Sequence, residues 1–496
     1  MSGIDAHLPA LQVVVPMLTA GFVVLLKQRG LAWAAATAAS AMAFAIAVQL
    51  TATAMGGEPI VYEMGNWPAP YGIVLHIDSF SAVLLLIITG ASTLSLVGGH
   101  ASLDSQIALD RQPYYYAAWL LAVAGLCGIA ITGDAFNIFV FMEISSLASY
   151  ILIAGGPNRR ALPAVFKYLI MGSIGATFYL IGVGLIYLMT GTLNLADMEM
   201  RIANVDDLRP IYLAAGFITV GLALKAAVFP LHVWLPNAYT WAPHMTTAFM
   251  AACATKVMLY VLFRFDYLVF QGNLEGHAIQ FTGYLMPLAL IAILVGSLIA
   301  MLQKNVKSVF AYSSVAQIGY IVLGASFITA AGLTAGVLHI FNHALAKGAL
   351  FLAIAVFAMA CSSLKLEDIG GIAKRMPVTF IGFVIAGLSL IGVPGTAGFI
   401  SKWYLITAAL ELGTTGALIV AIILISSLMA VYYVWRIVEV AAFGERDASA
   451  PDVSISKPLV VALWIAVFAN LYFGFVPELP VTLATETSAI LMEAKP

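Results

Sequence analysis

Charged residues are scarce in this chain of 496 residues, since Lys, Arg, Asp and Glu together make up only 9% of it. A typical soluble domain has about 25%. The net charge is −2 and no basic tail is present, which excludes the electrostatic footprint of a nucleic-acid-binding protein. Hydrophobic residues make up 62% of the chain. This composition predicts a polytopic membrane protein surrounded by the lipid bilayer.

Cysteines are also few, and glycine-rich phosphate loops are missing. Cys127, Cys253 and Cys361 are isolated, without a C-x-x-C motif or the spacing of metal ligands. A haem held between two histidines would need them to face each other across helices, and an i, i+4 pair does not provide this. We therefore expect no metal, no cofactor, no disulfide framework and no enzymatic activity of the chain by itself.

What the sequence does contain is a series of long apolar runs, which predicts about fourteen membrane-spanning helices. The first run has no basic region before it and no small-residue cleavage site after it, so we interpret it as a retained helix rather than a signal peptide. The run at 378–410 is too long for one straight crossing and contains Pro394, so we expect a broken helix there. The expected spans are 8–26, 31–52, 79–98, 114–132, 135–154, 162–189, 210–230, 244–263, 281–302, 308–328, 332–360, 378–410, 414–435 and 457–475.

Basic residues in the loops predict the orientation, because cytoplasmic loops are enriched in Lys and Arg. With the N-terminus placed outside, 13 of the 22 basic residues fall in inside loops and 5 lie within spans, and the 4 outside are Arg201, Arg209, Arg264 and Lys495. Both termini are therefore expected to be extracytoplasmic, in the cytoplasmic (inner) membrane of the cell. The outside loop 53–78 alternates apolar and polar residues around Gly and Pro, which predicts a β-hairpin. The inside set is Lys27, Arg29, Arg111, Arg159, Arg160, Lys304, Lys307, Lys365, Lys374, Arg375, Arg436, Arg446 and Lys457.

A weak internal repeat divides the chain. FVFMEISSLASYILIAG (139–155) resembles SVFAYSSVAQIGYIVLG (308–324), and a Lys in the next helix and a Pro-broken helix follow each run. Blocks of five helices would be inverted relative to each other, which is a transporter architecture. We expect an all-α fold with two inverted five-helix repeats. The predicted regions are 1–113 with three helices and the hairpin loop, 114–263 and 264–435 as the repeats, and 436–496 as a loop and the last helix.

The stretch 224–264 combines buried charge with helix breakers. Lys225 and Lys256 lie in runs otherwise apolar enough for a bilayer, and Pro230, Pro236 and Pro243 lie between them. A Lys at the centre of a membrane helix costs about 2.5–3.5 kcal/mol on insertion scales. A broken helix frees backbone carbonyls that need partners or water. These features predict a polar, hydrated cavity at membrane depth through which protons pass.

Other ionisable residues lie in apolar spans and extend the pattern. Five mid-span charges would cost on the order of 10–15 kcal/mol before pairing, which disfavours a role in packing alone. For each residue taken singly, the alternative to proton transfer is a structural role, either as a paired carboxyl or in an interhelical hydrogen bond. Lys167 lies near enough to a basic loop for its side chain to extend toward the membrane interface. The candidate proton-transfer residues are Glu143 near the centre of its span, Lys225, Lys256, the i, i+4, i+8 series His339, His343 and Lys347, and Lys402 after the second break.

The chain resembles the proton-conducting, antiporter-like subunits shared by multisubunit Mrp-type cation/proton antiporters and respiratory complex I. The similarity covers nearly the whole chain and is most specific in VFMEISSLASY, LKAAVFPLHVWLPNAY, TKVMLYVLFR, HIFNHALAKGALF and GVPGTAGFISKW. It implies fourteen helices in two inverted halves. It also implies that Glu143 pairs with Lys225 in the first half-channel, Lys256 passes protons inward, His343 and Lys347 continue the polar axis, and Lys402 opens the second half-channel.

Within that family the length, Lys402 and the missing C-terminal extension are most similar to the D subunit of the Mrp-type antiporter. A proton-pumping subunit of complex I or of a membrane-bound hydrogenase is the alternative, and the sequence does not separate the two. Either assignment implies other membrane subunits as partners and H⁺ as the transported ion. Whether Na⁺ passes through this chain stays open.

Overall fold

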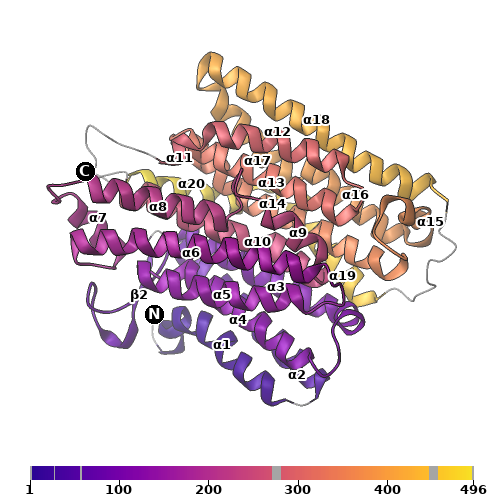
Figure 1. Cartoon of the computed structure of the whole chain (residues 1–496), viewed down its shortest axis with the longest axis horizontal. Coiled ribbons are helices and arrows are strands. Elements are labelled where there is room, and N and C mark those ends of the chain that lie inside the picture. Colours follow the sequence, from indigo (N-terminus) through magenta and orange to yellow (C-terminus); the bar gives the residue numbers. More distant parts are fainter. Residues whose placement is uncertain (1–2, 27, 56–57, 271–280, 446–455, 494–496) are drawn as a thin grey trace.

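The computed structural model describes residues 3–26, 28–55, 58–270, 281–445 and 456–493. They form a bundle of long helices that run side by side across the molecule (Figure 1). The N-terminal helices α1 and α2 lie at one edge, the long helix α18 lies at the opposite edge, and α10 and α14 lie between them. Lys27, Arg446 and Lys495, which entered the charge count, lie outside the described residues.

The elements from the N-terminus to the end of α10 lie within the first 263 residues. They are η1 (Gly3–His7), α1 (Leu8–Leu25), α2 (Arg29–Ala54), β1 (Ile60–Glu63), η2 (Met64–Asn66), β2 (Val74–Ile77), α3 (Ser79–Gln106), α4 (Gln112–Ile131), α5 (Ala135–Ala154), α6 (Ala161–Thr190), α7 (Leu195–Ile202), α8 (Arg209–Lys225), α9 (Trp234–Trp241) and α10 (His244–Phe263).

The remaining elements begin with a π-helical turn that continues α10. They are η3 (Arg264–Phe270), α11 (Phe281–Tyr284), α12 (Met286–Leu302), α13 (Val306–Ser326), α14 (Ala330–Ala360), η4 (Leu366–Ile369), α15 (Ile372–Arg375), α16 (Pro377–Ile391), α17 (Ala397–Leu410), α18 (Gly413–Phe443), α19 (Lys457–Phe475) and α20 (Glu478–Glu493).

The all-α membrane fold is confirmed, and each of the fourteen expected spans coincides with helix. Among the described residues, 11 helices are by themselves long and apolar enough to cross a membrane, or up to 12 if one bent pair counts as a span. The expected spans at 210–230, 281–302 and 378–410 correspond to shorter or interrupted helices. Length and composition therefore support eleven or twelve crossings and do not establish the predicted count of fourteen.

Two helices are interrupted where the sequence predicted breaks. The first interruption begins at Ala226, before Pro230 is reached, and Ala227 has a positive φ of 58°. Pro230 lies inside this gap, whereas Pro236 lies in the first turn of α9, where the missing N–H of Pro has no intrahelical partner to lose. The second interruption separates α16 from α17 and contains Pro394.

The predicted hairpin is present in the loop 53–78. Strands β1 and β2 pair antiparallel, with Ile60 opposite Ile77 and Glu63 opposite Val74. The residue after β2 is Asp78, whose carboxylate accepts a hydrogen bond from the Ser81 backbone N–H and caps α3. The hairpin therefore leads directly into a membrane helix.

A helix that the sequence analysis did not predict follows the expected last span. Helix α20 packs against α14 and α3, and the Ser488 and Thr334 hydroxyls hydrogen-bond at 2.8 Å. Its Thr and Glu residues make it too polar to be recognised as an apolar run. The region 436–496 therefore contains two helices after its loop.

Corresponding local contacts in the two halves support the predicted repeat. Asp134 caps α5 and pairs through an isolated bridge with Asn194, which follows α6. Asn305 caps α13 and pairs in the same way with Lys365, which follows α14. In each half the bridge joins the start of one helix to the end of the next. The boundaries of the repeats stay a prediction.

Candidate functional site

A buried ion pair connects α5 to the end of α8. Lys225 Nζ donates to Glu143 Oε1 at 2.8 Å and to Ser146 Oγ at 2.9 Å. The Lys225 side chain is only 3% exposed, whereas the Glu143 side chain is 30% exposed. The pair is therefore closed on the lysine side and accessible on the carboxylate side.

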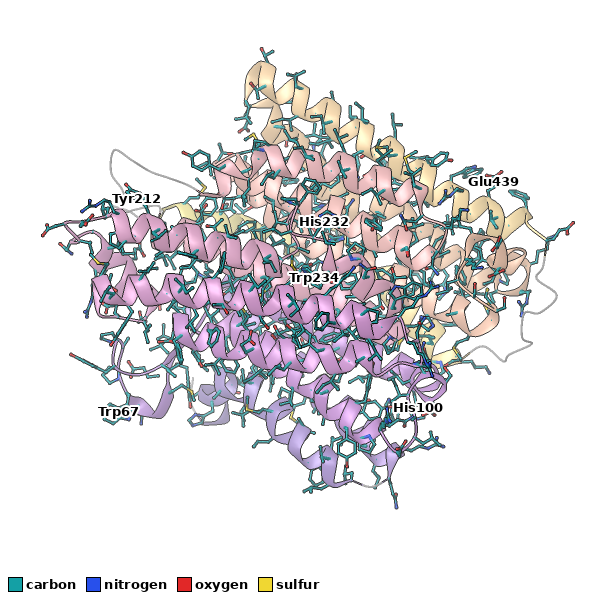
Figure 2. All side chains as sticks on the ribbon, in the orientation of Figure 1. Trp67, His100, Tyr212, His232, Trp234 and Glu439 are labelled. Carbon is teal, nitrogen blue, oxygen red and sulfur yellow. The ribbon has the colours of Figure 1, made fainter. Side chains whose placement is uncertain are left out.

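The helix break places Lys225 at a favourable position for a cation. Lys225 is the last residue of α8, and the free carbonyls of a helix C-terminus carry partial negative charge. One of those carbonyls, at Leu224, accepts a hydrogen bond of 3.0 Å from the Trp234 indole, which also stacks on Tyr168 at 4.0 Å. His232 and Trp234 lie near the middle of the molecule, where the chain turns between α8 and α9 (Figure 2). The end of α8 is thus held both by this side chain and by backbone hydrogen bonds, among them Val228 N–H to the Ala223 carbonyl at 2.8 Å.

A small polar cavity leads from Lys225 toward α10. It has a volume of about 10 Å³ and is lined by Ser145, Ser146, Ser149, Tyr168 and Lys225 on one side, and by Ala254 and Met258 of α10 on another. A space of roughly 10–15 Å³ is enough for one water molecule if polar partners are present. Lys256 lies on the same helix between Ala254 and Met258.

The next groups of the row come from α10 and α14. Lys256 is 1% exposed, and its Nζ donates to the Ala251 carbonyl of its own helix. It interacts electrostatically with His339, His343 and Lys347 of α14. The two imidazole rings are nearly parallel, with centroids 5.9 Å apart, as their i, i+4 spacing predicted.

His343 and Lys347 have different hydrogen-bonding states. Lys347 donates to the Phe310 carbonyl at 2.7 Å and to the Ser313 hydroxyl, both on α13. Both ring nitrogens of His343 lack a protein partner among the described residues, although the residue is only 2% exposed. Buried polar groups bind either protein or water, so His343 is the position in this row that most needs a water molecule.

His339 connects α14 to the second broken helix. Its Nδ1 lies 2.8 Å from Ser401 Oγ and its Nε2 lies 2.9 Å from Gln317 Oε1. The residue after Ser401, Lys402, donates to Ser427 Oγ at 3.0 Å and to the Ile391 carbonyl at 2.8 Å. Ile391 is the last residue of α16, so this lysine binds a carbonyl that the break has freed.

Gly392 leaves room for the Lys402 side chain in this position. It has a φ of 91°, and a Cβ added to it would lie 2.8 Å from Lys402 Cδ. Glycine therefore meets two needs here: a left-handed backbone at the end of α16 and space for the lysine side chain. The Nζ of the lysine placed in this way also lies 4.9 Å from the centre of the Tyr320 ring.

The seven predicted proton-transfer residues, which we call the polar row, lie on α5, α8, α10, α14 and α17, and Glu143 is the one carboxylate among them. Lys225 is paired with Glu143, whereas Lys256, Lys347 and Lys402 hydrogen-bond neutral oxygens. Lys167 does not join this row, because it is exposed on α6. Within the described part of the chain, no group of three or more His, Cys, Asp or Glu side chains is arranged to hold a metal ion.

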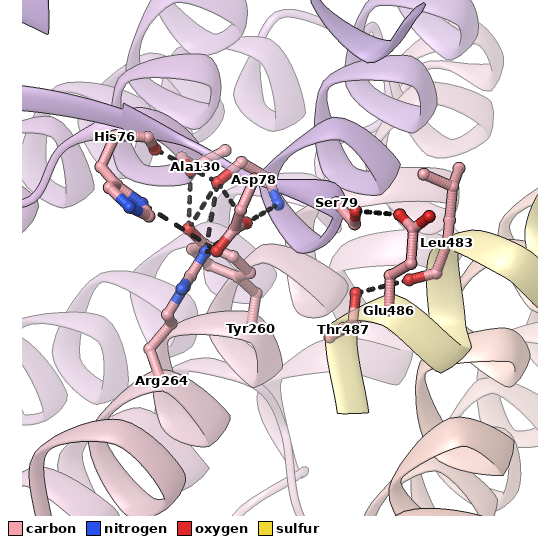
Figure 3. Close-up of polar contacts among 10 residues, drawn as sticks. His76, Asp78, Ser79, Ala130, Tyr260, Arg264, Leu483, Glu486 and Thr487 are labelled. Atoms are coloured by element: carbon pink, nitrogen blue, oxygen red, sulfur yellow. Dashed lines mark hydrogen bonds and ion pairs between the residues drawn. The ribbon is translucent and has the colours of Figure 1, made fainter. Parts of the chain in front are cut away.

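Sequence reasoning missed a buried lysine and a buried ion pair because both lie at the ends of spans. Lys307 was counted in an inside loop, yet it is 2% exposed and donates to the Ala242 carbonyl at 2.6 Å. Arg264 was counted in an outside loop, yet it binds both carboxylate oxygens of Asp78 at 2.5 Å (Figure 3). A charge at the end of an apolar run looks the same in sequence whether it faces water or protein.

The Asp78–Arg264 pair joins α3 to the end of α10 and is part of a larger polar cluster. Tyr260 lies one helical turn before Arg264, and its hydroxyl hydrogen-bonds the Ser81 hydroxyl at 3.1 Å. The Ser79 hydroxyl donates to Glu486 of α20 at 2.5 Å. Burial acts to raise the pKa of Asp78, but the Arg264 guanidinium and the hydrogen bonds outweigh it, so this pKa lies below its ordinary value. The cluster links α3, the end of α10 and α20 at the end of the bundle next to the hairpin.

Comparison with known proteins identifies the family. The family described as NADH:quinone oxidoreductase/Mrp antiporter, transmembrane region, matches residues 132–430. NADH-quinone oxidoreductase subunit N of Desulforudis audaxviator (strain MP104C) is 42% identical over 441 residues, 88% of this chain and 86% of that protein. The D subunit of the Na(+)/H(+) antiporter of Bacillus subtilis (strain 168) is 32% identical over 417 residues, 84% and 83% of the two chains.

The fold gives the same result. A chain of the Mrp complex from Dietzia sp. DQ12-45-1b superposes with a TM-score of 0.89 at 26% sequence identity, covering 99% of this chain and 98% of that one. The sequence match extends over more than half of this chain, and it includes the first break, the α14 histidines and the second break. The chain therefore belongs to the NADH:quinone oxidoreductase/Mrp antiporter family of membrane proteins.

Proposed function

We propose that this chain is the proton-translocating subunit of a multisubunit Na⁺/H⁺ antiporter of the Mrp type. The observation that carries the proposal is the row of buried ionisable groups from Glu143 to Lys402, which ends at a broken helix on each side. Intramembrane ionisable residues are expensive and mark ion pathways. The antiporter D subunit that is 32% identical to this chain supports the assignment.

The mechanism that we infer begins at the ion pair. Protonation of Glu143 removes the negative charge that stabilises the Lys225 ammonium. Lys225 then passes its proton through the one-water cavity toward Lys256. Glu143 then gives its proton to the neutral Lys225 amine 2.8 Å away, which restores both charges and the ion pair. Each turnover therefore moves one proton off the pair and resets the charges.

The second half of the pathway runs along α14. Lys256, His343 and Lys347 are mutually coupled cations or potential cations, so that charging one disfavours charging the next. His339 carries the proton to the α17 side, where its hydrogen bond to Ser401 ends beside Lys402. A water bound at His343 supplies the missing contact between the imidazole and its neighbours.

Partner subunits are part of the proposal. Glu143 is 30% exposed on α5 at the middle of the span, and a carboxylate facing lipid at that depth is costly. A neighbouring membrane subunit that covers this face would lower the cost. We therefore propose that the chain acts in a hetero-oligomeric complex as a transport subunit without a catalytic centre of its own, with both termini extracytoplasmic.

A proton-pumping subunit of a complex I-type oxidoreductase is the second candidate. The observation that favours it is the 42% identity to a protein named NADH-quinone oxidoreductase subunit N. The buried row would serve equally well in that setting, because it moves protons and does not depend on what drives them.

One experiment separates the two candidates. Everted membrane vesicles that contain the intact assembly are given either a Na⁺ pulse or NADH with a quinone, and the internal pH is followed with a fluorescent dye. The antiporter predicts a pH change with Na⁺ that Glu143→Gln abolishes, and no antiport when this chain is expressed alone. A pH change that depends on NADH and quinone and is insensitive to Na⁺ would overturn the antiporter assignment in favour of the second candidate.

A further inference from the structure

A large cavity lies on the side of the bundle, away from the polar row. It has a volume of about 470 Å³ and opens between α2, α3, α14 and α19. Its rim includes Phe44, Val48 and Ile465, which are exposed. All of these helices are membrane-spanning segments, so the opening faces the bilayer at the depth of the hydrocarbon.

The lining of this cavity is almost entirely hydrocarbon. Among the described residues that line it, Thr51 and Ser95 have polar side chains, and no charged residue takes part. The Thr51 hydroxyl already donates to the Ala47 carbonyl at 2.7 Å. A ligand with a polar head would find few partners here, whereas an apolar chain would leave no polar group unpaired.

The size of the cavity suits a hydrocarbon chain. An apolar protein cavity of roughly 150 Å³ holds one benzene molecule, so this cavity, with about 470 Å³, has about three times the space needed for six carbons.

The floor of the cavity is the back of the polar row. It is formed by Ala248 and Ala252 of α10 and by Phe341, Ala344 and Gly348 of α14. Ala252 lies one helical turn before Lys256, and Gly348 follows Lys347 directly. Small side chains therefore form part of the wall between the cavity and the buried lysines. The contents of the cavity determine whether the space behind that wall is apolar or hydrated.

We propose that this cavity binds one acyl chain of a bilayer phospholipid, and that the chain seals the lipid-facing side of α10 and α14 behind Lys256 and Lys347. The bilayer supplies the ligand at high local concentration, and the rim opens toward it. A bound acyl chain keeps water out of a space whose wall toward Lys256 and Lys347 includes the small residues Ala252 and Gly348.

Gly348 provides a direct test, because a Cβ added there meets no atom within 4 Å. Gly348→Leu would project into the cavity and occupy the place of the chain. Gly184 of α6 is a matched control: it is also helical with nothing within 4 Å, but it lies on an exposed face away from the cavity. Ala469→Leu fills the cavity from the opposite wall, on α19, and serves if Gly348→Leu lowers the amount of folded protein.

The experiment uses a phospholipid with a photoactivatable diazirine near the end of its acyl chain, added to membranes that hold the intact assembly. After illumination, the labelled peptides are mapped by mass spectrometry. We expect adducts on the floor residues Phe341 and Leu345, at least a fivefold loss of these adducts in Gly348→Leu, and no loss in Gly184→Leu. The proposal would be overturned if the wild type gave no floor adducts, or if Gly348→Leu and Ala469→Leu were labelled as strongly as the wild type. Crosslinking of the floor to another polypeptide would also overturn it.

Discussion

Lys225 and Glu143, which are 82 positions apart in the chain, form an ion pair of 2.8 Å between the end of α8 and the middle of α5. The lysine has additional support from Ser146 and from the C-terminus of its own helix. The carboxylate has the more exposed side chain. Of the two partners, Glu143 is therefore the group through which the surroundings can switch the pair.

Gly392 should be needed for transport rather than for folding alone. Gly392→Ala places a Cβ at a φ of 91° and 2.8 Å from Lys402 Cδ, so the lysine side chain must shift and its hydrogen bond to the Ile391 carbonyl is disturbed. Gly413→Ala is the control, because its φ is 64° but no atom lies within 4 Å. Both changes should cost about 1–2 kcal/mol through the left-handed backbone. Only Gly392→Ala should reduce ion-driven pH change in vesicles, and equal activity of the two variants would show that Lys402 does not need this position.

The Asp78–Arg264 pair should stabilise the protein in a pH-dependent way. The pKa of Asp78 is lowered from 3.8 in the folded protein, so its contribution is present above pH 3.8 and is lost as the pH falls through the folded value. Asp78→Asn leaves Arg264 buried without a counter-ion, and breaking such a pair costs about 3–5 kcal/mol. Thermal unfolding should show a large destabilisation at pH 7 that shrinks toward pH 3.

The control for this experiment is Asp207, whose carboxylate pairs with Arg209 at the surface. Its hydrogen bonds to Arg209 lower the pKa of Asp207 to about 2, yet water screens the pair. Asp207→Asn should leave the unfolding temperature almost unchanged at both pH values. If Asp78→Asn behaved like Asp207→Asn, the buried pair would have no role in holding α3 to α10.

Much of the fold could be predicted because membrane spans are signalled by composition alone. The spans, the hairpin and the two broken helices follow from apolar length, alternation and proline. The site residues could be selected because Glu143 and Lys256 lie at mid-span, where no local feature explains a charge. The pairing of Glu143 with Lys225 came only from the resemblance, since no local pattern relates residues on different helices.

What could not be predicted depended on contacts distant in sequence. The first break begins before Pro230 is reached, and the Trp234 indole, which comes from beyond the break, donates to the Leu224 carbonyl at the end of the helix. Lys307 and Arg264 seemed to be loop charges because their buried partners come from other segments. Helix α20 was missed because its stabilising contacts lie on α14 and α3 rather than in its own composition.

Lys256 should be dispensable for stability but not for transport. It hydrogen-bonds a neutral carbonyl and has no carboxylate partner of the kind that Lys225 has among the described residues. Replacing a poorly compensated buried charge with an apolar side chain of similar length is often neutral or stabilising. Lys256→Met should therefore keep or raise the unfolding temperature and abolish transport, whereas Lys167→Met, at an exposed position on α6, should leave both unchanged. Active Lys256→Met protein would remove this residue from the pathway.

The orientation predicted from the basic loops can be tested by labelling. Arg159 and Lys374 are exposed and should face the cytoplasm, whereas Asp206 is exposed and should face outward. The native Cys127, Cys253 and Cys361 are buried, so their background reaction should be small. A membrane-impermeant maleimide should label Arg159→Cys and Lys374→Cys only in everted vesicles, and Asp206→Cys only in right-side-out vesicles. The reverse result would invert the topology.

The ion pair itself allows the sharpest test, because stability and activity should respond differently to the same substitutions. Glu143→Ala leaves a 3% exposed lysine without its counter-ion, and Lys225→Ala leaves a carboxylate at membrane depth. Each single change should lower stability, by about 3–5 kcal/mol for a fully buried pair and less here, because Glu143 is partly exposed. The double substitution removes both charges and should regain part of that loss.

Transport should follow a different pattern in the same three variants. Each single variant and the double variant should be inactive, because the pathway has lost a proton carrier in every case. The exchange Glu143→Lys with Lys225→Glu restores opposite charges and should recover stability more fully than activity, since the lysine would now occupy the exposed side of the pair. Ion-driven pH change in everted vesicles, measured with the expression level of each variant, decides the matter. Near-normal transport by a well-expressed Glu143→Ala protein would reduce the carboxylate to a packing residue and remove the switch on which the proposed relay depends.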